Sequence, residues 1–264
     1  MNKLNKKIMC AALALTLAVV STPSVSLRSN AAGFDPKSVG GTGSNSIPAW
    51  KEINDDVIGW FKIPGTNVNW PVVVGKSNLY YNNLGYLKNK DKNGVIWADS
   101  DTKFGTKKEI SKNTVLYGHN WTNYTANPNV TKEEDLMFAQ VAAFHHLDFA
   151  QKTPYMHYST ENENMTWKVF AAFYTEIGFN YNLSDPDDKT FQAILDEARA
   201  KSRHDYDVDV NTNDKIITLS TCTRTYGSRN DQRFVVMARL MRDGEKIEEV
   251  KITENKDFTP PKFK

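Results

Sequence analysis

Three residues of this sequence have the types and the spacing to act together on a carbonyl group: Cys222, Arg233 and His119. Cys222 follows a strand-like run that begins at Lys215, and it is the only cysteine beyond the first ten residues. A thiolate held at a strand end is a nucleophile, and a nearby guanidinium can stabilise the oxyanion that its attack creates. Arg233 opens the next apolar run, so we expect it on the neighbouring strand, facing the same carbonyl.

His119 is the candidate general acid and base, because the leaving amine of a peptide bond must receive a proton. It follows the short apolar run 114–117, and Gly118 permits a tight turn that could aim the imidazole back over the sheet. A carboxylate that orients the imidazole could come from Asp231 or Asp99, and the sequence does not decide between them.

The sequence around these residues resembles the sortase family, and class B of that family in particular. The His, Cys and Arg motifs are matched by Leu116-Tyr117-Gly118-His119-Asn120, Thr218-Leu219-Ser220-Thr221-Cys222 and Arg233-Phe234-Val235-Val236. Further similarity lies in residues 59–66 and 70–73, and the resemblance as a whole covers roughly residues 46–242. Each motif is short, but three of them in the right order and beside predicted strands are specific together.

The resemblance implies a mostly β fold with helices, namely a closed or nearly closed sortase-type β-barrel with an N-terminal helix. It also implies a helix inserted before the strand that bears Cys222, which is typical of class B and walls the substrate groove. Thr223 departs from the acidic residue that follows the cysteine in some class B relatives, so the preferred substrate stays open.

The reaction that the resemblance implies is that of a cysteine transpeptidase, which cleaves the C-terminal sorting signal of an exported protein after a threonine. Cys222 would form the thioacyl intermediate, Arg233 would stabilise the oxyanion, and His119 would protonate the leaving amine and deprotonate the incoming one. The expected signal is similar to Asn-Pro-x-Thr followed by Asn or Gly, and the expected acceptor is an amine of a peptidoglycan peptide or a pilin. No cofactor is expected. Candidates for substrate contacts are Ser220, Thr221 and Tyr181.

Composition divides the chain into four parts. Residues 1–31 contain three lysines, an uncharged run and small residues, which predict a signal peptide or membrane anchor; residues 32–45 predict a flexible tether. Residues 46–242 form the predicted catalytic domain, and residues 243–264 are a charged tail that we expect to lack structure. The resemblance favours an anchor, which would hold the enzyme at the extracellular face of the membrane of a Gram-positive cell.

Apolar and β-branched runs predict most of the regular elements. A short helix capped by Ser46 would place Trp50, Ile53 and Val57 on one face. Further helices are predicted from a capping box at residues 131–134 and from Asp185, where residues 191, 194, 195 and 198 share a face. The predicted strands are residues 60–63, 69–74, 94–98, 154–159, 165–174, 216–220 and 234–240.

Charge and histidine spacing argue against two classes of partner. Residues 34–264 carry 29 basic and 31 acidic groups, and no basic patch predicts a nucleic-acid partner. The five histidines show no ligand spacing such as His-Glu-x-x-His, so the sequence predicts no metal site.

Two other function classes stay open. A cell-wall cysteine peptidase is one, although in papain-like peptidases the nucleophile opens a helix and precedes its histidine, whereas here His119 comes first and Cys222 ends a strand. L,D-transpeptidases share the order seen here, but their compact Ser-His-Gly-Cys motif is absent. The other class is a catalytically silent surface binding module, in which the groove is intact and the chemistry is lost. For Cys222 taken alone, the alternative interpretation is a small buried hydrophobic side chain.

Overall fold

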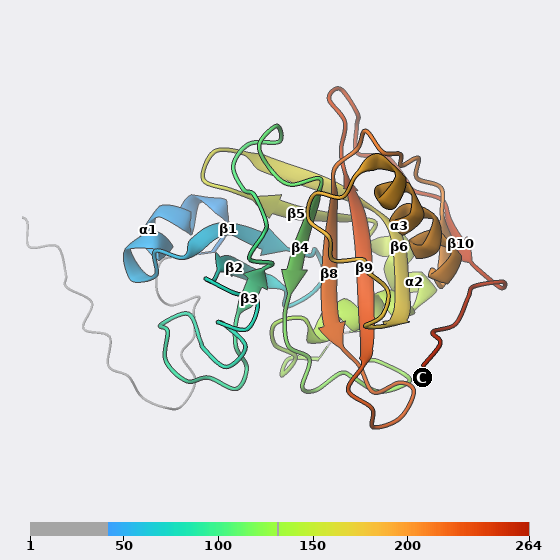
Figure 1. Cartoon of the computed structure of the whole chain (residues 1–264), viewed down its shortest axis with the longest axis horizontal. Coiled ribbons are helices and arrows are strands. Elements are labelled where there is room, and N and C mark those ends of the chain that lie inside the picture. The colour runs from blue at the N-terminus through green and yellow to red at the C-terminus, as the bar shows by residue number, and fades with distance from the viewer. Residues whose placement is uncertain (1–41, 131, 264) are drawn as a thin grey trace, which may run out of the picture. The chain divides into compact units, whose positions relative to one another are not determined.

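The computed structural model describes residues 42–130 and 132–263 (Figure 1). The predicted signal peptide or anchor, and most of the predicted tether, lie outside the described residues. Within the described part of the chain, no helix combines the length and the apolar character needed to cross a membrane.

Eight strands form a closed barrel in the order β1-β2-β3-β4-β8-β9-β6-β5. Most neighbours are antiparallel, whereas β2 with β3 and β4 with β8 are parallel pairs. The predicted closed β-barrel is therefore confirmed. The strands are β1 (Val57–Lys62), β2 (Asn69–Val74), β3 (Ile96–Ala98), β4 (Asn113–Tyr117), β5 (Tyr155–Ser159), β6 (Asn164–Glu176), β8 (Ile216–Cys222) and β9 (Gln232–Leu240).

The register of three central strands brings distant parts of the sequence to one end of the barrel. Cys222, the last residue of β8, lies opposite Arg233 of the antiparallel strand β9. On its other side β8 runs parallel to β4, with Tyr117 opposite Ser220, so both strands end at the same edge. The chain that leaves β4 toward His119 therefore emerges beside the cysteine.

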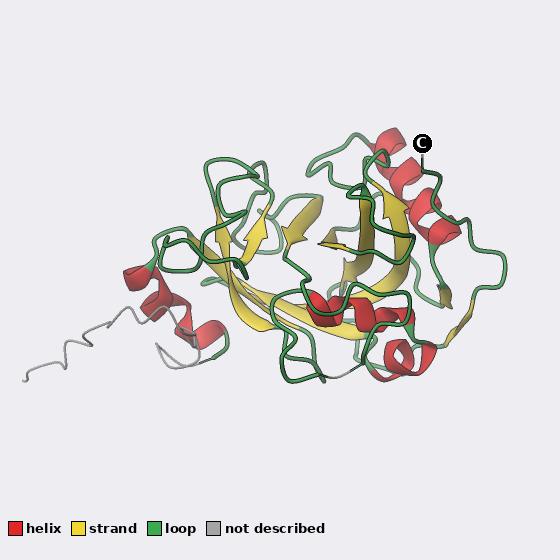
Figure 2. Cartoon of the chain, turned by 90° about the horizontal axis from the view of Figure 1, so that it is seen from below, coloured by secondary structure: helices red, strands yellow, loops and turns green. Residues whose placement is uncertain are grey.

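The helices lie on the outside of the barrel (Figure 2). A 3-10 turn (η2, Ser44–Ser46) leads into α1 (Ile47–Ile53), where Ser46 occupies the N-cap position but donates its hydroxyl to the Gly43 carbonyl instead of capping. Val57, predicted on the same helix face, begins β1.

The inserted helix before the cysteine strand is α3 (Asp188–Lys201), which packs against β6. It begins two to three residues later than predicted, because Asp187 is the N-cap and accepts a 2.7 Å hydrogen bond from the amide of Thr190. The predicted apolar face is confirmed, since all four of its residues are buried: Phe191, Ile194, Leu195 and Ala198.

The helix predicted from the capping box at residues 131–134 is wrong in type and position. The chain forms the 3-10 helix η3 (Ala139–His145) followed by α2 (Leu147–Lys152), and Met137 has a positive φ of 49°. Tertiary contacts override the local pattern, because the amide of Phe138 bonds to the His119 carbonyl and Asn67 donates to three carbonyls between residues 132 and 135. Residues 139–144 are all buried, so no single helical face is selected.

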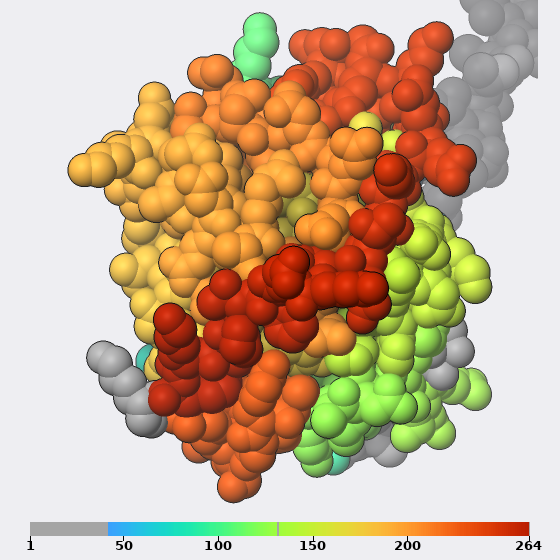
Figure 3. Space-filling model, turned by 90° about the vertical axis from the view of Figure 1, so that its right-hand side faces the viewer, coloured from blue at the N-terminus to red at the C-terminus, as the bar shows by residue number. Residues whose placement is uncertain are grey.

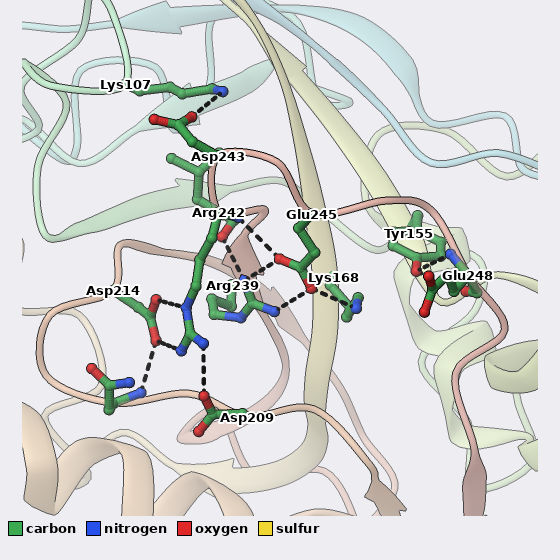
Figure 4. Close-up of polar contacts among 12 residues, drawn as sticks. Lys107, Tyr155, Lys168, Asp209, Asp214, Arg239, Arg242, Asp243, Glu245 and Glu248 are labelled. Atoms are coloured by element: carbon green, nitrogen blue, oxygen red, sulfur yellow. Dashed lines mark hydrogen bonds and ion pairs between the residues drawn. The ribbon is translucent and has the colours of Figure 1, made fainter.

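The segment after Asp243 has regular structure, contrary to the prediction. Residues 252–254 form β10 (Ile252–Glu254), which pairs with a strand that the sequence analysis missed, β7 (His204–Tyr206). Val250 and Ile252 are buried, and ion pairs among Arg239, Arg242 and Glu245 and their partners hold the start of the segment (Figure 4). A charged composition did not predict this outcome because the charges are paired.

Candidate active site

Cys222, His119 and Arg233 line one pocket of about 230 Å³, at the edge of the barrel where β4 and β8 end and β9 begins. Ser220 and Thr221 line it as well, and no carboxylate is among its lining residues. The spatial convergence that the sequence analysis expected is therefore present. The remaining walls come from the loop after β2, from β3 and from the end of β4: Asn78, Leu79, Asn82, Trp97, Tyr117 and Gly118.

Cys222 is exposed, and its thiol is free. The strand β8 fixes its backbone through pairing with Arg233, and the side chain of Asn120 donates a hydrogen bond to its carbonyl, with the two atoms 3.3 Å apart. Asn120 is itself buried and also exchanges hydrogen bonds with the backbone of Asn123. The nucleophile therefore sits on rigid backbone while its sulfur stays accessible.

The imidazole of His119 is oriented by a backbone carbonyl. Its Nε2 lies 2.7 Å from the carbonyl oxygen of Asn82. Because a carbonyl can only accept, Nε2 carries a proton, and in the neutral ring Nδ1 is left as the proton acceptor. The ring also contacts the rings of Trp97 and Trp121, with centroid distances of 5.4 Å and 5.3 Å.

The close packing around His119 also requires a glycine. Gly94 has a positive φ of 65°, and a Cβ at this position would come within 2.8 Å of the His119 ring. Neither predicted orienting carboxylate bonds to the imidazole: Asp99 accepts from Asn78 and Tyr117, and Asp231 pairs with Arg229. The prediction of an orienting carboxylate is wrong within the described residues, because the loop after β2 supplies a carbonyl in its place.

Arg233 is aimed by backbone carbonyls. Its Nη1 donates to the oxygens of Asn230 and Gln232 at 2.9 Å and 2.8 Å, and no ion pair forms on it in the described part of the chain. The guanidinium thus keeps donors and a full charge for a group that enters the pocket.

The three predicted substrate-contact residues have different positions. Ser220 and Thr221 line the pocket, but the hydroxyl of Thr221 donates to the carbonyl of Gly118 and so joins β8 to the turn before His119. Tyr181 is buried behind Ser220, with its hydroxyl 2.8 Å from Ser220 Oγ, and burial raises the pKa of Tyr181. Tyr181 is therefore placed to support Ser220 from behind the pocket wall.

A second pocket of about 360 Å³ adjoins the first and shares Cys222, His119 and Asn82 with it. Its further lining is polar and aromatic, with one cation and no anion: Asn83, Asn120, Trp121, Tyr124, Thr223 and Arg224. The cysteine and histidine thus stand between two cavities. No group of three or more potential metal ligands occurs among the residues that the structure describes.

Sequence reasoning missed Asn82, Asn120 and the two tryptophans beside His119. Asn120 directly follows the histidine, so its position was visible in the sequence, but its contact with the Cys222 carbonyl depends on the parallel pairing of β4 and β8. Asn82 lies in a loop with many turn-forming residues, and no pattern there indicates which carbonyl faces the imidazole.

Comparison with known families gives a match to the sortase domain over residues 61–241. The chain belongs to the sortase family. This sortase is 32% identical to sortase B of Staphylococcus aureus over 193 residues, which is 73% of either protein, and 29% identical to sortase B of Listeria monocytogenes over 72% of either protein. The predicted family and its class B character are confirmed, and the protein is a cysteine transpeptidase of sortase B type.

Solved structures agree with this assignment. A complex of Staphylococcus aureus sortase B with substrate has a TM-score of 0.65 at 30% identity, over 76% of this chain and 87% of that one. Sortase B of Clostridium perfringens has a TM-score of 0.62 at 29% identity, over 74% of this chain and 99% of that one. The similarity therefore spans most of either solved chain.

Proposed function

We propose that this sortase cleaves the C-terminal sorting signal of exported proteins after a threonine and transfers the protein to an amine of the cell wall. The observation that carries the proposal is the convergence of Cys222, His119 and Arg233 on one pocket. In this proposal the signal is similar to Asn-Pro-x-Thr followed by Asn or Gly, and the acceptor is an amine of a peptidoglycan peptide or a pilin.

In the first half-reaction the thiol proton of Cys222 passes to His119, the thiolate attacks the threonine carbonyl, and the Arg233 guanidinium stabilises the oxyanion. As the intermediate collapses the C–N bond breaks, and the imidazolium of His119 gives its proton to the leaving amine. The hydrogen bond from Nε2 to Asn82 assigns this exchange to Nδ1, the ring nitrogen that is free of the loop carbonyl. A thioester on Cys222 remains.

In the second half-reaction the incoming amine attacks the thioester, neutral His119 accepts its proton, and Cys222 leaves as the thiolate. The two adjoining pockets support this division of labour, because both share the cysteine and the histidine. We assign the signal peptide to the pocket with Ser220 and Arg233, and the amine to the pocket with Trp121 and Arg224.

We also propose that the enzyme works at the extracellular face of the cell membrane, held by its N-terminal segment. The family membership and the apolar run within residues 1–31 support this location. Fractionation of cells that produce the full chain, followed by protease treatment of intact cells, tests both the membrane association and the exposed side.

Cleavage of a small library of pentapeptide signals, followed by mass spectrometry, tests the function. We expect release of the residues after threonine, a thioester on Cys222, and a new amide when a peptidoglycan-type amine is present. Cys222→Ala should abolish all three products. Binding of the peptides without any cleavage would indicate a binding module. Hydrolysis that continues unchanged when an amine is added, without a new amide, would indicate a peptidase.

A further inference from the structure

The last described segment, residues 255–263, crosses the surface as an extended strap and lies outside the region matched by the sortase domain. Figure 3 shows this C-terminal strap in dark red on one face of the molecule. Backbone amides hold it at intervals: Asn255 donates to the Arg203 carbonyl, Thr259 to the Ala200 carbonyl at 2.7 Å, and Lys262 to the Glu176 carboxylate. The strap therefore has a defined path.

The strap reaches the loop that connects Cys222 to Arg233, here called the Arg233 loop (residues 223–232). The ring of Phe263 packs against Tyr226 of this loop, with centroids 5.5 Å apart. The guanidinium carbon of Arg229, also in the loop, lies 4.3 Å from the centre of the same ring. Phe263 thus makes one aromatic and one cation–π contact with the Arg233 loop.

These contacts continue inward to Arg233 through short hydrogen bonds. Arg229 forms a bidentate pair with Asp231, with distances of 2.6 Å and 2.8 Å. The side chain of Gln232 closes the loop by accepting from the Tyr226 amide and donating to the carbonyls of Gly227 and Arg229. The two carbonyls that hold Arg233, those of residues 230 and 232, belong to this same loop.

We propose that Phe263 is a positioning residue for the transpeptidation reaction: it holds the Arg233 loop so that the guanidinium of Arg233 points at the reacting carbonyl. The proposal rests on the role of Arg233 in the proposed function. Phe263 touches neither pocket, so it acts through the loop, and its loss should weaken oxyanion stabilisation without changing the thiol.

The test uses the full chain with a fluorogenic sorting-signal peptide that the wild type cleaves. Phe263→Ala should lower kcat about fivefold with an unchanged KM, which is the size expected from losing one cation–π and one aromatic contact. Phe263→Tyr keeps the ring and should restore wild-type kcat. The matched control is Phe258→Ala, which removes the strap's other aromatic ring from its place over Arg203 and should leave kcat unchanged.

A double-mutant cycle with Arg233→Lys separates a positioning role from a general structural one. If Phe263 acts through Arg233, Phe263→Ala should have no further effect on kcat in the Arg233→Lys background. An equal loss in both backgrounds, no loss in the wild-type background, or an equal loss from Phe258→Ala would overturn the proposal. If the wild type cleaves no signal peptide, the proposed function fails instead, so the two failures are distinguishable.

Discussion

The strand β9 carries two arginines whose surroundings differ completely. Arg239, near the end of the strand, is almost fully buried and forms a bidentate pair with Glu245, both distances being 2.7 Å (Figure 4). Arg233, near its start, is half-buried and bonds to the carbonyls of Asn230 and Gln232. The charge of Arg239 is therefore balanced by the carboxylate of Glu245, whereas backbone carbonyls leave the charge of Arg233 unbalanced.

This difference explains how one barrel can be stable at one end and reactive at the other. A buried cation without a partner is costly, so the chain supplies Glu245, which Lys168 contacts as well. At the catalytic end an internal carboxylate would compete with the oxyanion for Arg233, and backbone carbonyls orient the guanidinium without cancelling its charge. His119 follows the same rule, because a carbonyl orients it.

The largest effect should follow from removing the charge at the catalytic end. We expect Arg233→Gln to lower kcat/KM for a sorting-signal peptide by about 100-fold or more, the usual loss when an oxyanion donor is removed. The unfolding midpoint in urea should hardly change, since no internal ion pair is lost. A large loss of stability with little loss of activity would reverse the roles assigned to the two arginines.

The opposite result is expected at the other arginine. Glu245→Ala leaves Arg239 buried without its carboxylate and should lower the free energy of unfolding by about 3 kcal/mol. Turnover per folded molecule should stay close to the wild type. Glu248→Ala is the matched control, because both hydrogen bonds between Glu248 and Tyr155 use the backbone of Glu248. Comparable destabilisation by both variants would contradict the assignment.

Groups near the two ends of the barrel should also change the stability in different pH ranges. Burial lowers the pKa of His145 to about 4, and its Nδ1 lies 2.9 Å from the hydroxyl of Tyr174, whose ring packs on Tyr226 of the Arg233 loop. The unfolded chain binds this proton near pH 6.5 and the folded one near pH 4, so stability should fall as the pH falls between these values.

The carboxylate of Glu245 affects the stability in a lower pH range than His145 does. Its hydrogen bond with Arg239 lowers the pKa of Glu245, so its contribution is complete above about pH 4.5 and is lost only at more acidic pH. Urea unfolding at about pH 7, 5.5, 4.5 and 3.5 checks both statements. Between about pH 7 and 4.5, His145→Gln should make the stability depend less steeply on pH, whereas Glu245→Ala should leave that slope unchanged. Burial also lowers the pKa values of His204 and His157, so these residues account for the slope that remains in His145→Gln.

The smallest effect is expected from a neutral hydrogen bond at the catalytic end. Asn120→Ala removes the donor to the Cys222 carbonyl together with two hydrogen bonds to the backbone of Asn123. It should lower kcat about fivefold, because only one of these hydrogen bonds reaches the cysteine, and one hydrogen bond contributes about 1 kcal/mol. Asn127→Ala, an exposed position in the same loop, serves as the control. An unchanged kcat in Asn120→Ala would show that β8 alone positions the cysteine.

Local patterns predicted the parts of the fold in which side chains alternate or recur regularly. The long runs that became β6, β8 and β9 were predicted within a few residues, and the apolar face of α3 was correct. The helix predicted after residue 131 was wrong, because residues 139–144 are buried on every side. In addition, hydrogen bonds from the Asn67 side chain hold backbone carbonyls of this region. Asn67 is far away in the sequence, so no local signal encodes that contact.

The sequence by itself determined which side chains could react, because the chemistry of Cys222, His119 and Arg233 belongs to the residue types and the flanking strands to local propensity. Only the tertiary structure decided what surrounds them: the carbonyl of Asn82 at the imidazole, Asn120 at the cysteine, and Phe263 on the Arg233 loop. Each is a contact between segments far apart along the chain. Such contacts exist only once the barrel register is set, so no window of the sequence contains them.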